Sequence, residues 1–135
     1  MLGFQGGIIM DIKESPSIPY CSLGIMALES SSELGNRINE LLMEKRKDYD
    51  NETITQNLGS GKSFLINMTD TRFSNGEGKI IIEDTVRGKD IFILCDVGNY
   101  NCTYTMYGFE NHKSPDDHFQ DIKRVLSAIG GKQGG

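Results

Sequence analysis

The sequence predicts an α/β domain in which a largely parallel β-sheet is flanked by helices in a three-layer arrangement. Short, nearly continuous apolar runs at residues 23–28 and 90–96 are typical of strands that are buried on both faces. Two other segments carry apolar residues at helical spacing, and each follows a helix-capping signal. Buried strands that alternate with amphipathic helices indicate the class of fold that binds ligands at the carboxyl ends of its strands.

The first expected strand, residues 23–28, leads directly into the first expected helix. Ser30 and Glu33 have the spacing of a capping box, in which each side chain accepts a hydrogen bond from the other residue's backbone. Apolar residues then recur at helical spacing to about residue 47, namely Leu34, Ile38, Leu41 and Leu42.

A polar, glycine-rich segment at residues 48–62 predicts a loop, followed by strands at 63–68, 78–83 and 90–96. We expect the last of these strands at the centre of the sheet. Within the loop, residues 59–63 resemble a phosphate-binding loop. However, Gln56 stands where that motif needs its first glycine, and a strand is expected where a helix should follow. A flexible turn is the favoured interpretation.

The final helix is the best specified element of the chain. Ser114 is placed to cap it, Pro115 suits its first position, and Asp116 and Asp117 suit its first turn. Its expected apolar face consists of Phe119, Ile122, Val125, Leu126 and Ile129, and two glycines at 130 and 131 end it.

Several polar residues could bind a ligand but have simpler interpretations. Asp116, Asp117 and His118 could hold a metal ion, yet acids in the first turn of a helix also satisfy its free N–H groups. No pattern pairs His112 with a Ser or Cys nucleophile. Four aromatic residues could stack on a base, although packing on the sheet or on a neighbouring subunit is favoured: Tyr100, Tyr104, Tyr107 and Phe109.

Charge and cysteine content exclude several classes of protein. A net charge of -5, with 14 scattered Lys and Arg residues, argues against binding to nucleic acid. Three widely spaced cysteines suggest neither a disulfide framework nor a zinc site. We therefore expect a cytoplasmic protein. No apolar run approaches the roughly 18 residues that span a membrane, so no membrane partner is expected. We expect residues 1–20 to be a flexible extension, 21–132 to be one domain and 133–135 to be a tail.

Two linked motifs at residues 73–77 and 83–90 are more specific than ordinary turns. The first reads Phe-Ser-Asn-Gly-Glu, and the second reads Glu-Asp-Thr-Val-Arg-Gly-Lys-Asp and leads into an apolar strand. In this order and spacing they resemble the amino-terminal domain of ribose-phosphate pyrophosphokinases, and the resemblance extends over roughly residues 23–132. Thr85 replaces the Ser usual in the family, and the loop at 97–113 is longer than its common form.

The resemblance implies roles for five residues. Phe73 would pack on the adenine of a neighbouring subunit's ATP, and Asn75 and Glu77 would form hydrogen bonds with the polar edge of that base. Thr85 and Arg87 would lie where family members bind an inhibitory phosphate group, for which a guanidinium fork is well suited.

The resemblance also implies a reaction, the transfer of diphosphate from Mg²⁺-ATP to ribose 5-phosphate, which yields phosphoribosyl diphosphate and AMP. The sequence contains no Asp-Asp-x-x-Asp-Thr-Gly-Gly-Thr loop for the ribose phosphate and no basic catalytic loop, so no catalytic residue or Mg²⁺ ligand is assigned. We therefore expect a truncated domain that is inactive alone and pairs with copies of itself or with a complete synthetase. The alternative is a noncatalytic nucleotide-binding or regulatory partner of such a synthetase.

Overall fold

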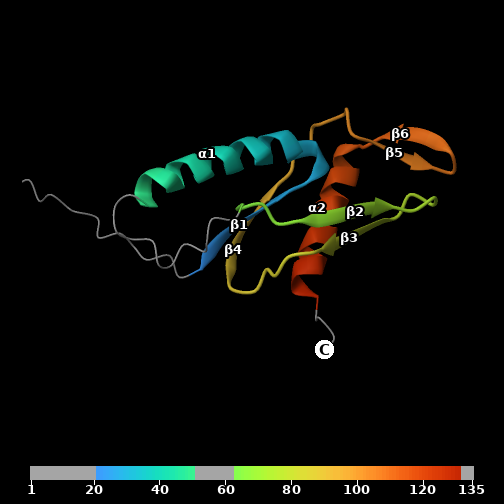
Figure 1. Ribbon diagram of the computed structural model, residues 1–135. Coiled ribbons are helices and arrows are strands. Elements are labelled where there is room, and N and C mark those ends of the chain that lie inside the picture. The colour runs from blue at the N-terminus through green and yellow to red at the C-terminus, as the bar shows by residue number, and fades with distance from the viewer. Residues whose placement is uncertain (1–20, 51–62, 132–135) are drawn as a thin grey trace, which may run out of the picture.

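The computed structural model describes residues 21–50 and 63–131 (Figure 1). In chain order the elements are β1 (Ser22–Ala27), the 3-10 turn η1 (Glu29–Ser31), α1 (Ser32–Asp50), β2 (Met68–Arg72), β3 (Gly78–Ile82), β4 (Lys89–Leu94), β5 (Thr103–Met106), β6 (Phe109–His112) and α2 (Pro115–Gly130). The expected extension and tail, and nearly all of the possible phosphate-binding loop, lie outside the described residues.

Strands β1 and β4 form the parallel part of the fold, with Ser22 opposite Lys89 and Ala27 opposite Leu94. On its other side β1 makes a single parallel bridge between Ile25 and Leu65. The remaining described strands pair as two antiparallel hairpins, β2 with β3 and β5 with β6. The mixed α/β class is thus confirmed, but parallel pairing is confined to β1, β4 and this bridge, and the three-layer arrangement stays a prediction.

The strand expected at residues 63–68 is reduced to that bridge, because side chains take hydrogen bonds that a longer ladder would use. The N–H of Phe64 donates to Asn39 Oδ1 at 2.8 Å, and the N–H of Asn67 donates to Asp84 Oδ2 at 2.7 Å. The next paired strand starts only at Met68. Since β1 lies between this bridge and β4, it is β1 and not β4 that is central among the described strands.

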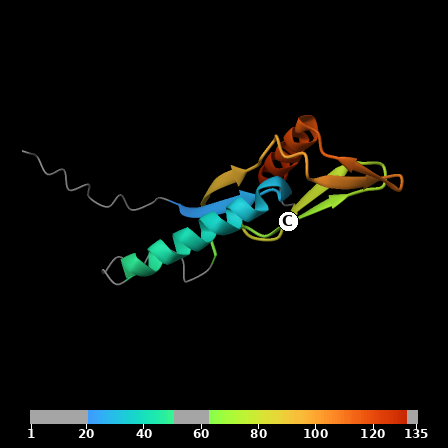
Figure 2. The ribbon, with the colours of Figure 1, turned by 90° about the horizontal axis from the view of Figure 1, so that it is seen from above.

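The hydrophobic core lies where α2 meets β3 and the parallel strands. Met26 and Val125 are fully buried, and Leu28, Ile66 and Ile80 complete the buried cluster. Helix α1 lies along β1, whereas α2 packs on β3 (Figures 1 and 2). No helix in the described ranges is long and apolar enough to cross a membrane.

Strand β4 is not buried on both faces as its apolar run predicts. Ile91 and Ile93 pack against the core, but Phe92 between them is 60% exposed. Alternation of this kind is normal for a strand that has one covered face.

Helix α1 also differs from its prediction at its start. The helix is preceded by the 3-10 turn η1. Leu28 occupies the cap position before that turn, and its side chain makes no capping hydrogen bond. Ser30 instead accepts the N–H of Asp96 at 3.0 Å, so it joins the helix start to the end of β4. The buried face contains Gly35, where an added Cβ would lie 2.4 Å from the Cβ of Ala27, and this glycine permits α1 to approach β1 closely. Leu34 and Leu41 are exposed instead.

Helix α2 begins as the sequence predicts. Ser114 and Asp117 form a reciprocal capping box, and Pro115 occupies the first helical position. The predicted face is only partly correct, because Phe119 and Leu126 are exposed. Their places on the buried side are taken by two polar residues, His118 and Asp121.

Candidate nucleotide-binding turn

The turn at residues 73–77 joins β2 to β3 and is closed by its own hydrogen bonds. The N–H of Phe73 donates to the Glu77 carbonyl at 2.8 Å, and the N–H of Gly76 donates to the Phe73 carbonyl at 2.8 Å. Gly76 has a φ of +85°, a backbone conformation that glycine adopts without a Cβ penalty. The Ser-Asn-Gly sequence was expected to form a turn between strands, and it does.

Three side chains predicted to contact a nucleobase come together on this turn. Phe73 is 49% exposed, and Asn75 and Glu77 are exposed as well. The Oδ1 atom of Asn75 accepts the N–H of Glu77 at 3.0 Å, which leaves its amide NH₂ group directed elsewhere as a donor. The turn therefore offers an apolar ring, an amide donor and a carboxylate acceptor to one ligand.

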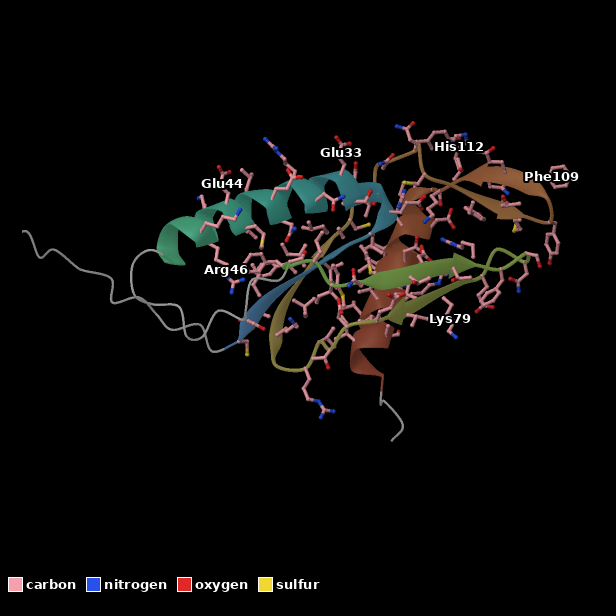
Figure 3. The ribbon with its side chains drawn as sticks, in the orientation of Figure 1. Glu33, Glu44, Arg46, Lys79, Phe109 and His112 are labelled. Atoms are coloured by element: carbon pink, nitrogen blue, oxygen red, sulfur yellow. The ribbon has the colours of Figure 1, made fainter. Side chains whose placement is uncertain are left out.

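The β5–β6 hairpin lies directly beside this turn, in the segment where only a long loop was expected. The N–H of Tyr107 donates to the Ser74 carbonyl at 2.8 Å. Tyr107 and Gly108 form a two-residue connection with φ values of +48° and +85°, as hairpins of this length require. Tyr107 and Phe109 are 71% and 75% exposed, and Figure 3 shows Phe109 at the tip of the hairpin. Two further aromatic rings are thus exposed on the hairpin next to Phe73.

The other two aromatic residues of this segment each contact a side chain of the same chain, although Tyr100 is still 66% exposed. Tyr100 stacks on His112, with ring centroids 4.4 Å apart and planes 8° apart. Tyr104 lies under the guanidinium of Arg72, 4.8 Å from it. His112 Nδ1 also lies 2.8 Å from the Tyr100 carbonyl, so its ring is held by structural contacts.

A cluster of charges lies behind the turn. It contains three cations and three carboxylates, namely Arg72, Lys113, Arg124, Glu29, Asp70 and Asp121. Asp121 is at its centre: its Oδ1 is 3.0 Å from Arg72 Nη2 and 2.6 Å from Arg124 Nη1. Its Oδ2 is 3.1 Å from Lys113 Nζ, which also lies 2.7 Å from Glu29 Oε2. The side chains of Asp121 and Lys113 are each only 3% exposed, so these opposite charges compensate one another away from solvent.

The pKa values in the cluster reflect the opposing effects of burial and of neighbouring charges. Burial lowers the pKa of Lys113, but its hydrogen bonds to Glu29 and Asp121 outweigh that effect and hold the pKa above its usual value. Burial raises the pKa of Asp70, and the neighbouring Asp121 raises it further. The cluster thus holds Lys113 as a cation across the neutral range.

Sequence reasoning missed Lys113 and Asp121. Asp121 lies three residues after His118 and four before Val125, so it occupies the same helical stripe as a core residue. A polar residue on such a stripe is the signal that could have revealed a buried carboxylate.

Thr85 and Arg87 lie in the loop at residues 83–88, at the opposite end of β3 from the turn (Figure 1). Both side chains are exposed, and Gly88 beside them has a φ of +70°. The five predicted site residues therefore form two groups, one at each end of β3.

Of the three residues that could form a metal cluster at the start of α2, Asp117 caps the helix. Burial raises the pKa of Asp117, but hydrogen bonds from the Ser114 N–H and hydroxyl outweigh this effect and hold that pKa below its usual value. His118 Nε2 lies 2.7 Å from the Asn99 carbonyl. In the described part of the chain, no three His, Cys, Asp or Glu side chains lie close enough to hold a metal ion.

Comparison with known families identifies the domain. A family model described as the N-terminal domain of ribose phosphate pyrophosphokinase matches residues 23–132, which include both the turn and the loop. No curated protein and no solved structure matches the chain. The match covers most of the 135 residues, and the chain therefore belongs to the family of the N-terminal domain of ribose phosphate pyrophosphokinase.

Proposed function

We propose that the 73–77 turn contacts the adenine of ATP in a ribose-phosphate diphosphokinase, at an interface with another subunit. The observation that carries this proposal is the grouping of Phe73, Asn75 and Glu77 as exposed side chains on one self-closed turn. Membership of the family supports it further.

The three side chains match the chemistry of adenine. The Phe73 ring supplies a flat apolar surface for the base, and its half-exposed state leaves area that a ligand can bury. The Glu77 carboxylate can accept a hydrogen bond from the exocyclic amino group. The free NH₂ group of Asn75 can donate to a ring nitrogen.

The 83–88 loop has a different role in this proposal. An exposed guanidinium at Arg87, with the Thr85 hydroxyl two residues away, suits an inhibitory phosphate group of a nucleoside diphosphate. Magnesium would arrive with ATP and neutralise phosphate charge in the reaction. Because no group of three metal-binding side chains lies in the described ranges, no residue of this chain is assigned to it.

The 135 residues by themselves should form no phosphoribosyl diphosphate. Transfer of the diphosphate group requires two positioned substrates and neutralisation of developing charge. The ribose-phosphate loop and the basic loop that would supply these functions are absent from the sequence. A coupled assay for AMP tests this directly, and AMP formation that depends on ribose 5-phosphate would contradict it.

The adenine contact is tested in a complete synthetase that carries this domain. Phe73→Ala or Glu77→Ala should raise the Michaelis constant for ATP roughly tenfold, because ring contact or a hydrogen bond worth about 1–3 kcal/mol is lost. The Michaelis constant for ribose 5-phosphate should change much less. Phe119→Ala is the matched control, since it removes a ring that is 56% exposed but lies on α2 and not on the turn or the β5–β6 hairpin. An unchanged ATP constant in the Phe73 and Glu77 variants would refute the proposal.

A further inference from the structure

Arg72 connects the nucleotide-binding turn to the buried charges behind it. We propose that Arg72 is a positioning residue that fixes the conformation of the 73–77 turn for its ligand, with the Asp121 carboxylate as its anchor. This inference rests on the proposed function of the turn. It assigns no contact between Arg72 and the nucleotide.

The guanidinium of Arg72 contacts three separate parts of the fold. Its Nη1 donates to the Gly76 carbonyl at 2.8 Å, inside the turn itself. Its Nη2 donates to Asp121 Oδ1 at 3.0 Å, on α2. Its Cζ atom lies 4.8 Å from the centre of the Tyr104 ring, on β5. One side chain therefore ties the turn, the helix and the neighbouring hairpin together.

The position of Arg72 in the chain explains how one side chain can do this. It is the last residue of β2 and pairs with Gly78, the first residue of β3, so it stands at the base of the turn. Its side chain is 12% exposed, and a planar guanidinium holds its donors in a fixed fork. A lysine ammonium at this position could not keep both hydrogen bonds and the ring contact in the same geometry.

The anchor itself is rigidly held. Asp121 lies on α2 and is fixed by Lys113 and Arg124 as well as by Arg72. The Nε atom of Arg72 is buried and has no hydrogen-bond partner among the described residues. A buried donor without a partner is unfavourable. The guanidinium therefore keeps its hydrogen bonds to Gly76 and Asp121 although this orientation leaves Nε without a hydrogen bond in the described part of the chain.

This arrangement predetermines where the ligand-contacting side chains lie. Gly76 is held at its carbonyl by Arg72, and its N–H closes the turn onto Phe73. Fixing Gly76 therefore restricts Phe73 on one side and Glu77 on the other. Because the turn is already ordered, less conformational entropy is lost when the ligand binds. This raises affinity without any new contact.

The test compares Arg72→Met with Arg124→Met in a complete synthetase that carries this domain. Both variants remove one cation from Asp121 Oδ1, and each leaves that carboxylate two other partners. Only Arg72 also binds the turn carbonyl. We expect Arg72→Met to increase amide hydrogen exchange in residues 73–77 and to weaken ATP binding about tenfold, the size of one charge-assisted hydrogen bond. Arg124→Met should change neither by more than about twofold.

Arg72→Lys separates positioning from general stability. Lysine keeps a positive charge near Asp121, so the resistance to urea should largely return. The turn should still exchange rapidly and bind ATP weakly, because the contact with Gly76 is lost. Recovery of ATP binding together with stability would overturn the inference, as would equal effects of Arg72→Met and Arg124→Met.

The same titrations distinguish this inference from the proposed function. If Phe73→Ala leaves ATP binding by the synthetase unchanged, the proposed function fails and the inference falls with it. If Phe73→Ala weakens binding and Arg72→Met does not, only the positioning role of Arg72 is refuted.

Discussion

The two ends of the β2–β3 hairpin are built in different ways, although both carry residues predicted to bind a nucleotide. At the 73–77 turn, Gly76 is held by Arg72 and the backbone of Ser74 is bonded to the β5–β6 hairpin. At the 83–88 loop, the side chains of Thr85 and Arg87 form no hydrogen bond or ion pair within the described ranges.

This difference matches what each end is proposed to recognise. A base is read by a ring and two polar groups that must keep their relative positions, so its contact surface benefits from a fixed backbone. A phosphate carries charge on several equivalent oxygens, and a free guanidinium can adjust to it. The contrast predicts that substitutions at the turn affect both stability and ATP binding, whereas substitutions of Thr85 or Arg87 in the loop affect regulation alone.

The largest effect should follow from removal of the anchor at the turn end. Asp121→Ala leaves Arg72, Lys113 and Arg124 without their shared buried carboxylate, which should cost about 3–5 kcal/mol of unfolding free energy. Asp84→Ala at the loop end removes one acceptor for the Asn67 N–H and should cost about 1 kcal/mol. Urea unfolding of both variants measures the difference. Equal losses would contradict the distinction between the two ends.

Two of the three described glycines with positive φ lie at opposite ends of this hairpin and provide a closely matched second test. Alanine at Gly76 or at Gly88 adopts an unfavourable backbone conformation, at a cost of about 1–2 kcal/mol. At Gly76 the new Cβ would also lie 2.8 Å from Met106 Sδ, whereas at Gly88 nothing lies within 4 Å. We expect Gly76→Ala to be more destabilising by about 1–3 kcal/mol, the range for overpacking. A Gly88 variant as unstable as the Gly76 variant would show that the loop end is packed as tightly as the turn.

A smaller effect is expected from the cap of α2, the helix that carries the anchor. The pKa of Asp117 is below its ordinary value of 3.8 in the folded state. Its contribution to stability is therefore present above pH 3.8 and is lost as the pH falls through the lower pKa of the folded protein. Asp117→Asn should lower stability by about 1 kcal/mol at neutral pH and by less in acid. An unchanged dependence of unfolding on pH would show that the cap makes no such contribution.

The smallest effect on stability should come from the loop itself. Arg87→Ala removes an exposed side chain and should change the unfolding free energy by less than about 0.5 kcal/mol. In a complete synthetase that carries this domain, the same change should weaken inhibition by a nucleoside diphosphate more than it weakens catalysis. Equal inhibition of variant and parent would remove Arg87 from the regulatory proposal.

Local signals in the sequence were sufficient for elements whose stability is local. The cap of α2 follows from Ser114, Pro115 and Asp117, since these residues act within one turn of helix. The 73–77 turn follows from its Ser-Asn-Gly sequence, and the grouping of Phe73, Asn75 and Glu77 follows from their place on one short connection.

Features that depend on distant partners were not predictable in the same way. An apolar run shows that β4 is a strand, but whether Phe92 is covered depends on what packs over it. The β5–β6 hairpin is closed by Tyr107 and Gly108, and a tyrosine with positive φ is too unusual to be expected from sequence. Asp121 acquires its role only when Arg72, 49 residues earlier in the chain, is brought against it.

The parallel pairing of β1 with β4 has a consequence for how the chain folds as it is synthesised. Ser22 pairs with Lys89, so the first strand leaves the ribosome well before its hydrogen-bonding partner exists. Helix α1 and the β2–β3 hairpin depend mainly on nearby residues and can form during this interval, but closing the long loop between β1 and β4 comes late. Until then Ile25 and Met26, both buried in the folded domain, have no paired strand on the β4 side. An apolar strand that waits for its partner in this way is the kind of surface through which incompletely folded chains associate.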